Sequence, residues 1–187
     1  MTHHPSTHAA STRRLWTAAA AGALCLGVAA PMAVAQDSGA EMPEKDITFT
    51  SAEGEEIGTG TLTGTPAGVL IEVDLQNLPA DSWHGFHIHE KGVCDVESGF
   101  KSAGGHFNAG DTEHGLLVEG GAHSGDMPNQ YVSADGKLIA QVLNTAVSIG
   151  GEADVSGRAI VIHGGADDYE SQPSGDAGER IACAVIE

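Results

Sequence analysis

From about residue 46 onward, the chain alternates apolar and polar residues over short stretches. In the range 68–75, apolar Ile71, Val73 and Leu75 occupy every second position, and Glu72 and Asp74 lie between them. This period of two predicts a half-buried strand, with the apolar side chains on one face and the acids on the other. Comparable stretches predict eight strands, at 47–51, 56–63, 68–75, 83–89, 116–119, 137–143, 158–163 and 181–186.

Turn residues separate these strands and define the fold class. The whole chain contains 26 glycines, many of them between the predicted strands. No long amphipathic helix, heptad or internal repeat accompanies them. Short strands with glycine turns are typical of an all-β fold, so we expect an antiparallel barrel or sandwich.

The first 35 residues follow a different pattern. A polar, basic stretch at 3–14 precedes an apolar run from Leu15 to about Ala30, and Ala33-Val34-Ala35 offers small residues for cleavage. This order predicts a cleaved signal peptide at 1–35 and therefore an exported, periplasmic or secreted protein. The apolar run is too short and alanine-rich for a permanent membrane span. A twin-arginine signal at Arg13-Arg14 is the weaker alternative, because the flanking residues match that motif poorly.

The remaining chain has the length of one domain and a strongly acidic balance. We expect a mobile acidic lead at 36–46 and a single domain at 47–187, with about 150 residues in all. The formal net charge of -18 becomes -20 when Arg13 and Arg14 leave with the signal. Nucleic acids and anionic membrane surfaces are therefore excluded as natural partners.

Histidines are the main candidates for chemistry. Seven of the ten lie beyond residue 35, and His87 and His89 stand two apart within the predicted strand 83–89. Alternate side chains of a strand share a face, so both rings can bind one ion while Phe86 and Ile88 point into the core. His163 ends another predicted strand. Imidazole is the commonest metal ligand, and the whole group predicts a two-metal site. Its other members lie in a glycine-rich stretch: His106, His114, His123 and Asp126.

Three segments together resemble the copper,zinc superoxide dismutase family. They are Gly85–Glu90, Gly104–Asn108 and Arg158–Asp168, and the similarity runs from about Ile47 to the C-terminus. The resemblance implies an eight-stranded Greek-key β-barrel with long metal-binding and electrostatic loops. It implies that copper, as Cu(II) or Cu(I), is bound by His87, His89, His106 and His163. It implies that Zn(II) is bound by His106, His114, His123 and Asp126, with His106 shared between the metals.

The resemblance also assigns supporting roles. Asp167 matches the acid that hydrogen-bonds His87 and His114, and the spacing of four from His163 favours it over the adjacent Asp168. Arg180 matches the arginine beside the copper, which attracts an anion, and it is implied in catalysis together with His106.

The cysteines fit the same family. Loss of Cys25 with the signal leaves an even count of two, as an exported disulfide protein requires. The resemblance pairs these two, Cys94 and Cys183. His84 matches a structural, hydrogen-bonding histidine of the family, outside the ligand set.

Two features depart from the family pattern. Ala109 stands where many members have proline, and the stretch from His163 to Arg180 is shorter than in the animal enzymes and closer to the bacterial type. Both leave the ligands in place. They leave open the shape of the channel that guides the substrate.

The implied function is enzymatic. A superoxide dismutase converts superoxide to dioxygen and hydrogen peroxide, with copper as the redox metal and zinc as a structural one. The alternative is an extracytoplasmic protein that binds or buffers copper and zinc without turnover. The complete ligand set and Arg180 favour the enzyme. The expected small-molecule partner is superoxide, and both a monomer and a homodimer are compatible with the resemblance.

Overall fold

The computed structural model describes residues 42–187. The predicted signal peptide at 1–35 and most of the predicted acidic lead lie outside the described residues. One 3-10 helix, η1 (Lys101–Ala103), accompanies the strands. The strands are β1 (Glu44–Ser51), β2 (Glu56–Thr65), β3 (Gly68–Leu75), β4 (Ser82–His89), β5 (Asp126–Val132), β6 (Leu138–Asn144), β7 (Arg158–His163) and β8 (Arg180–Ile186).

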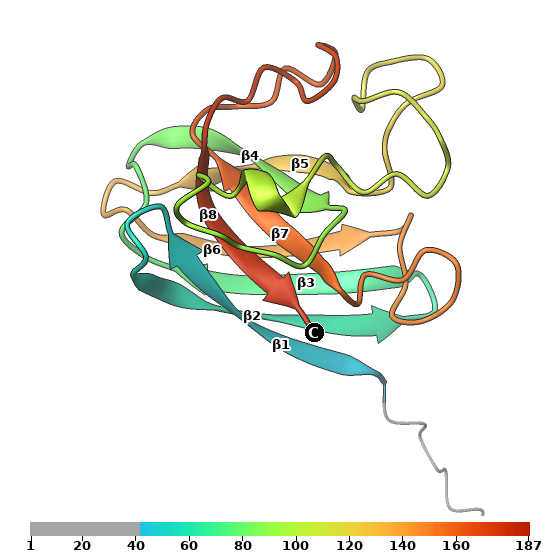
Figure 1. Ribbon diagram of the computed structural model, residues 1–187, viewed down its shortest axis with the longest axis horizontal. Coiled ribbons are helices and arrows are strands. Elements are labelled where there is room, and N and C mark those ends of the chain that lie inside the picture. Colours follow the sequence, from blue (N-terminus) through green and yellow to red (C-terminus); the bar gives the residue numbers. More distant parts are fainter. Residues whose placement is uncertain (1–41) are drawn as a thin grey trace, which may run out of the picture. The chain divides into compact units, whose positions relative to one another are not determined.

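All eight strands belong to one antiparallel sheet that curls into a nearly closed barrel (Figure 1). Their order is β5-β4-β7-β8-β1-β2-β3-β6. The connections from β3 to β4 and from β6 to β7 join strands that are not neighbours, as in a Greek key. The prediction of an all-β, eight-stranded Greek-key barrel is confirmed.

The barrel interior is the hydrophobic core. Ile71, Val73 and Leu75 of β3 are buried, as their alternation predicts, and Phe86 and Ile88 of β4 point into the same core. Burial of such a side chain contributes roughly 1.5–3 kcal/mol. The inward residues of β4 thereby fix the strand whose other face carries the histidines.

The predicted strand positions need two corrections. Residues 116–119 form a turn in the structure, and the strand missing from the prediction is β5. The apolar run Leu116-Leu117-Val118 resembles a strand in sequence, yet Leu116 and Leu117 are exposed on a loop. In β5, polar residues and Pro128 mask the alternation. β1 also begins at Glu44, three residues earlier than predicted, because residues 44–46 pair with β2.

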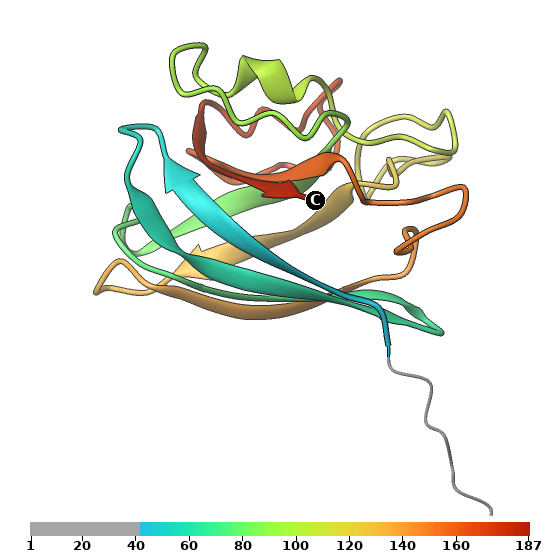
Figure 2. The ribbon, with the colours of Figure 1, turned by 60° about the horizontal axis from the view of Figure 1, so that its bottom comes forward.

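Long loops lie on the outside of the barrel. In Figure 2, the segment that carries η1 lies above β7 and β8. Cys94 of this segment forms a disulfide with Cys183 of β8, with 5.7 Å between the Cα atoms. The disulfide inferred from the resemblance is therefore confirmed, and it ties the segment 94–106 to the barrel wall. Within residues 42–187, no helix is long and apolar enough to cross a membrane.

Candidate metal centre

The outer face of β4 presents two histidines to the covering loops. His87 and His89 are fully buried although they face away from the core. His87 pairs with Asp126 of β5, and His89 pairs with Ala159 of β7. His163 ends β7 and is 4% exposed. Strand pairing therefore brings ligand candidates from three strands to one patch of the barrel surface.

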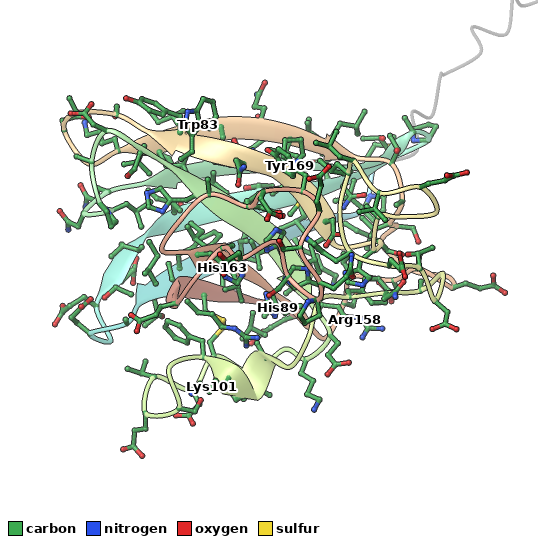
Figure 3. The ribbon with its side chains drawn as sticks, turned by 90° about the horizontal axis from the view of Figure 1, so that it is seen from above. Trp83, His89, Lys101, Arg158, His163 and Tyr169 are labelled. Atoms are coloured by element: carbon green, nitrogen blue, oxygen red, sulfur yellow. A yellow bond between two sulfur atoms is a disulfide. The ribbon has the colours of Figure 1, made fainter. Side chains whose placement is uncertain are left out.

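Four histidines form the first group. One ring nitrogen from each lies within 4.8 Å of the corresponding atoms of the others, and Figure 3 shows two of them, His89 and His163, close together. The group consists of His87, His89, His106 and His163. The third member comes from the loop that follows η1.

Three histidines and one acid form the second group. Their ligand atoms also lie within 4.8 Å of one another, and the group consists of His106, His114, His123 and Asp126. His106 belongs to both groups. Among the described residues, these are the two sets of histidine, cysteine and acidic side chains with metal-ligand geometry. The sequence-predicted candidates are thus brought together in the predicted partition.

In His89 and His163, a hydrogen bond donated by Nδ1 leaves the lone pair of Nε2 free for a metal. His89 Nδ1 donates to the carbonyl of Gly104 at 3.0 Å and His163 Nδ1 to that of Gly178 at 3.4 Å. Their two Nε2 atoms then carry lone pairs and face each other at 3.4 Å. Two acceptors at this distance need a cation between them, so this pair fits a metal.

Ring nitrogens without a proton or a hydrogen-bond partner also occur around the second group. His114 Nε2 donates to Asp167, so its Nδ1 is an acceptor, yet it lies 3.0 Å from the Asp126 carboxylate. Four buried ring nitrogens lack any hydrogen-bond partner: His87 Nδ1, His106 Nε2, His114 Nδ1 and His123 Nδ1. Orphaned buried acceptors of this kind cost free energy unless an ion satisfies them. The donor set therefore fits two metal ions.

Asp167 holds rings from both groups. Its Oδ2 accepts from His87 Nε2 at 2.7 Å and its Oδ1 from His114 Nε2 at 3.1 Å. A carboxylate in this place fixes the tautomer and orientation of ligating imidazoles. The neighbouring Asp168 instead accepts hydrogen bonds from Glu170 and Ser171 of its own loop. The structure thus brings Asp167, and not Asp168, to the histidines.

Burial sets the protonation of the first group. Desolvation lowers the pKa of His87 to about 4, of His89 to about 2 and of His163 to about 3. These rings are therefore neutral at neutral pH, which is the form that binds metal. Burial alone would raise the pKa of Asp126, but hydrogen bonds from His106 and the Gly115 N–H hold it well below its usual range. The acid is consequently a carboxylate.

Arg180 is linked to the first metal group through one backbone carbonyl, that of Gly104. Its Nη1 donates to the Phe100 carbonyl and its Nη2 to the Gly104 carbonyl, both at 2.6 Å. Gly104 also accepts from His89. Burial lowers the pKa of Arg180 from a very high value, and the guanidinium stays charged. The disulfide at Cys183, three residues later, holds the same segment against this strand.

His84 lies on the opposite face of β4 from the ligands. Its Nδ1 is 2.7 Å from the His163 carbonyl, and its Nε2 is 2.8 Å from the Ser82 hydroxyl. It is fully buried with both nitrogens engaged. This arrangement matches the structural role predicted for it and joins β4 to the end of β7.

Two amide side chains near the site carry no signal in the sequence. Asn129 of β5 donates to the backbone carbonyl of Asp167 and accepts from its N–H, both at 2.8 Å. Gln172 bonds the backbone of His114. Neither residue belongs to a motif quoted above, because both act through backbone groups distant in the sequence. Their contribution is visible only once the chain is folded.

Comparison with known sequences agrees with this geometry. A family model described as copper/zinc superoxide dismutase (SODC) matches residues 48–186. The chain is 48% identical over 143 residues to superoxide dismutase (Cu-Zn) 1 of Aquifex aeolicus, covering 74% of this chain and 84% of that protein. It is 41% identical over 143 residues to superoxide dismutase (Cu-Zn) of Caulobacter vibrioides, covering 73% and 81%.

Solved structures show the same fold. A superoxide dismutase-like protein from Bacillus subtilis matches with a TM-score of 0.74 and 34% identity, covering 78% of this chain and 99% of that one. Cu/Zn superoxide dismutase from Brucella abortus matches with a TM-score of 0.66 and 32% identity, covering 78% and 100%. Sequence, fold and ligand geometry agree, and the chain belongs to the copper/zinc superoxide dismutase family.

Proposed function

We propose that this protein is an exported superoxide dismutase that uses copper and zinc to convert superoxide to dioxygen and hydrogen peroxide. The observation that carries the proposal is the shared histidine: His106 belongs to both buried groups, with its Nδ1 2.8 Å from the Asp126 carboxylate and its Nε2 buried without a hydrogen-bond partner. A storage site has no need of two different ligand sets joined by one ring.

Donor chemistry assigns the two metals. Four imidazole nitrogens suit Cu(II), so copper would be held by His87, His89, His106 and His163. Three nitrogens and one carboxylate oxygen suit tetrahedral zinc, so zinc would be held by His106, His114, His123 and Asp126. Asp167 supports both sites, because it orients His87 in one and His114 in the other.

Arg180 binds the substrate. Superoxide is an anion, and the chain as a whole is strongly acidic. The overall field therefore opposes approach, although charges beyond a Debye length of about 8 Å contribute little at physiological salt. Within that range, the fixed guanidinium attracts the anion and donates hydrogen bonds to it. The Phe100 and Gly104 carbonyls hold Arg180 in place for this task.

Bound copper would supply the one-electron chemistry, accepting an electron from one superoxide and returning it to the next. His106 serves the proton balance of the second half-reaction, which consumes two protons per peroxide. Its Nε2 is buried without a hydrogen-bond partner, so it can hold one proton whenever it is not a ligand. The surrounding histidines stay neutral because their pKa values are low.

Two features support export. The N-terminal pattern at 1–35 has the order of a signal peptide. The Cys94–Cys183 disulfide persists best in an oxidising compartment such as the periplasm or the extracellular space.

Metal analysis together with a superoxide assay tests the proposal. The purified mature protein should bind one copper and one zinc per chain and accelerate the loss of superoxide far beyond its spontaneous rate. The metal-free protein is the control. Full metal occupancy without such acceleration would contradict the enzyme and favour the metal-buffering alternative, and a single metal at saturation would contradict the two-site assignment.

A further inference from the structure

The loop that follows Asp167 is hydrogen-bonded to the backbone of His114, a member of the second metal group. The side-chain Oε1 of Gln172 accepts from the His114 N–H at 3.0 Å, and its Nε2 donates to the His114 carbonyl at 2.7 Å. The same Nε2 donates to the Glu170 carbonyl at 3.1 Å. One amide therefore satisfies both backbone groups of His114, in the manner of a paired strand, across 58 residues of sequence.

Other contacts close around the same peptide. On the far side of His114, the Gly115 N–H donates to the Asp126 carboxylate at 3.0 Å. Gly115 has φ of +115°, and a Cβ there would lie 2.1 Å from the carbonyl of Tyr169, the residue labelled in Figure 3. The 114–115 peptide is thus enclosed between Asp126 and the segment 169–172.

The ring of His114 is enclosed as well. Its Nε2 donates to Asp167, and a Cβ at Gly175 would lie 1.8 Å from the Asp167 Oδ1 and 2.7 Å from His114 Nε2. Asp167 therefore fixes the rotamer of the His114 side chain. Gln172 sets the position of the backbone from which the ring projects. Placement of Nδ1 beside Asp126 needs both.

We propose that Gln172 is a positioning residue for zinc, which holds the His114 backbone so that Nδ1 stays at the metal. This inference rests on the proposed zinc site. Residues that orient metal ligands typically change affinity by about 10- to 100-fold when they are lost. Gln172 acts through backbone bonds on an exposed loop, so we expect the low end of that range, about tenfold.

Chelator competition on metal-loaded variants tests the role. Gln172→Ala should weaken zinc binding about tenfold, leave copper binding within about twofold, and change the visible spectrum of cobalt placed in the zinc site. The matched control is Gln130→Ala, because that amide donates to Pro128 on β5 and should leave zinc affinity unchanged.

Three outcomes would overturn the inference in distinguishable ways. Equal zinc affinity in Gln172→Ala and the parent would show that the backbone bonds do not position His114. A parallel fall in copper affinity, zinc affinity and metal-free stability would show a general structural role instead. Absence of zinc binding in the parent would contradict the proposed function, and the inference would fall with it.

Discussion

The barrel has two walls that differ in the burial of their outer faces. The first is formed by β2, β3 and β6, and the second by β4 and β7. On β3, buried residues alternate with exposed or half-buried ones, and the outward Glu72 and Asp74 meet solvent. On β4, every residue from His84 to His89 is buried. The first wall has one covered face, whereas loops cover the second wall from outside. The buried outer face of the second wall is where the candidate metal ligands lie.

This difference explains why the metal side depends on ions. Apolar side chains in the barrel core satisfy one another by packing. The outward histidines of the second wall have buried nitrogens without partners, so burial is unfavourable until ions bind. The packing of the first wall should therefore not depend on metal, whereas that of the second should depend on metal and pH.

The largest expected effect concerns the metal-free protein between pH 7.5 and pH 5. Each of His87, His89 and His163 has a folded pKa far below its ordinary 6.5. At pH 5 the unfolded chain therefore binds protons that the folded chain does not, and stability falls as pH falls from about 6.5 toward about 4. The loss is on the order of 2 kcal/mol per ring.

Urea unfolding of the metal-free protein at the two pH values measures this loss. The carboxylates of Asp126 and Asp167 stay ionised in both states at pH 5, so they do not offset it. The variant His163→Asn should lose part of the pH dependence, because its ring is one of those whose pKa burial lowers. Equal free energies of unfolding at pH 7.5 and pH 5 would show that these rings are not held neutral.

The next largest effect concerns the inner and outer faces of the first wall, compared by truncating one isoleucine on each. Ile71 is fully buried in β3, and Ile139 of the neighbouring β6 is 74% exposed. Ile71→Ala should cost about 2–5 kcal/mol of unfolding free energy through lost burial and a cavity. Ile139→Ala should cost about 0.5 kcal/mol or less. Neither change should alter copper or zinc affinity; a comparable cost for both would mean that the strand faces the other way.

Asp167 tests the second wall and its covering loop. Asp167→Asn should weaken zinc binding by about 10- to 100-fold, because the single oxygen of the amide can accept from only one of His87 and His114, and the NH2 group faces the N–H of the other. Asp168→Asn is the matched control, since that side chain bonds only within its own loop, and it should do little. Chelator competition gives the affinities. A larger loss at Asp168 would reverse the assignment.

The last effect, with the lowest minimum change, concerns Arg180, which touches the covering loop and no metal group directly. Arg180→Ile should lower the rate with superoxide by about tenfold or more at unchanged copper content, because a positioned cation acts on the anion. Stopped-flow decay of superoxide at low salt measures the rate. Activity within about twofold of the parent would contradict the binding of superoxide by Arg180.

The two walls also differ in how far the sequence predicts them. Alternation along β3 predicts its register, and the spacing of His87 and His89 predicts their common face. β5 escaped prediction because Asp126, Pro128 and Asn129 interrupt the apolar pattern. Gln172 escaped it because side-chain bonds to a distant backbone leave no local pattern. The candidate metal ligands were assigned through family resemblance, whereas the groups that hold them in place depend on loop conformation, which local sequence does not determine.

In the proposed function, one ring, that of His106, joins two metal sites. Exchange of zinc for cobalt in the copper-loaded protein tests it directly, because an imidazolate shared by both ions couples their unpaired electrons. We expect the Cu(II) electron paramagnetic resonance signal to be strongly diminished when cobalt occupies the group of His106, His114, His123 and Asp126. An unchanged copper signal at full cobalt occupancy would contradict the shared ligand.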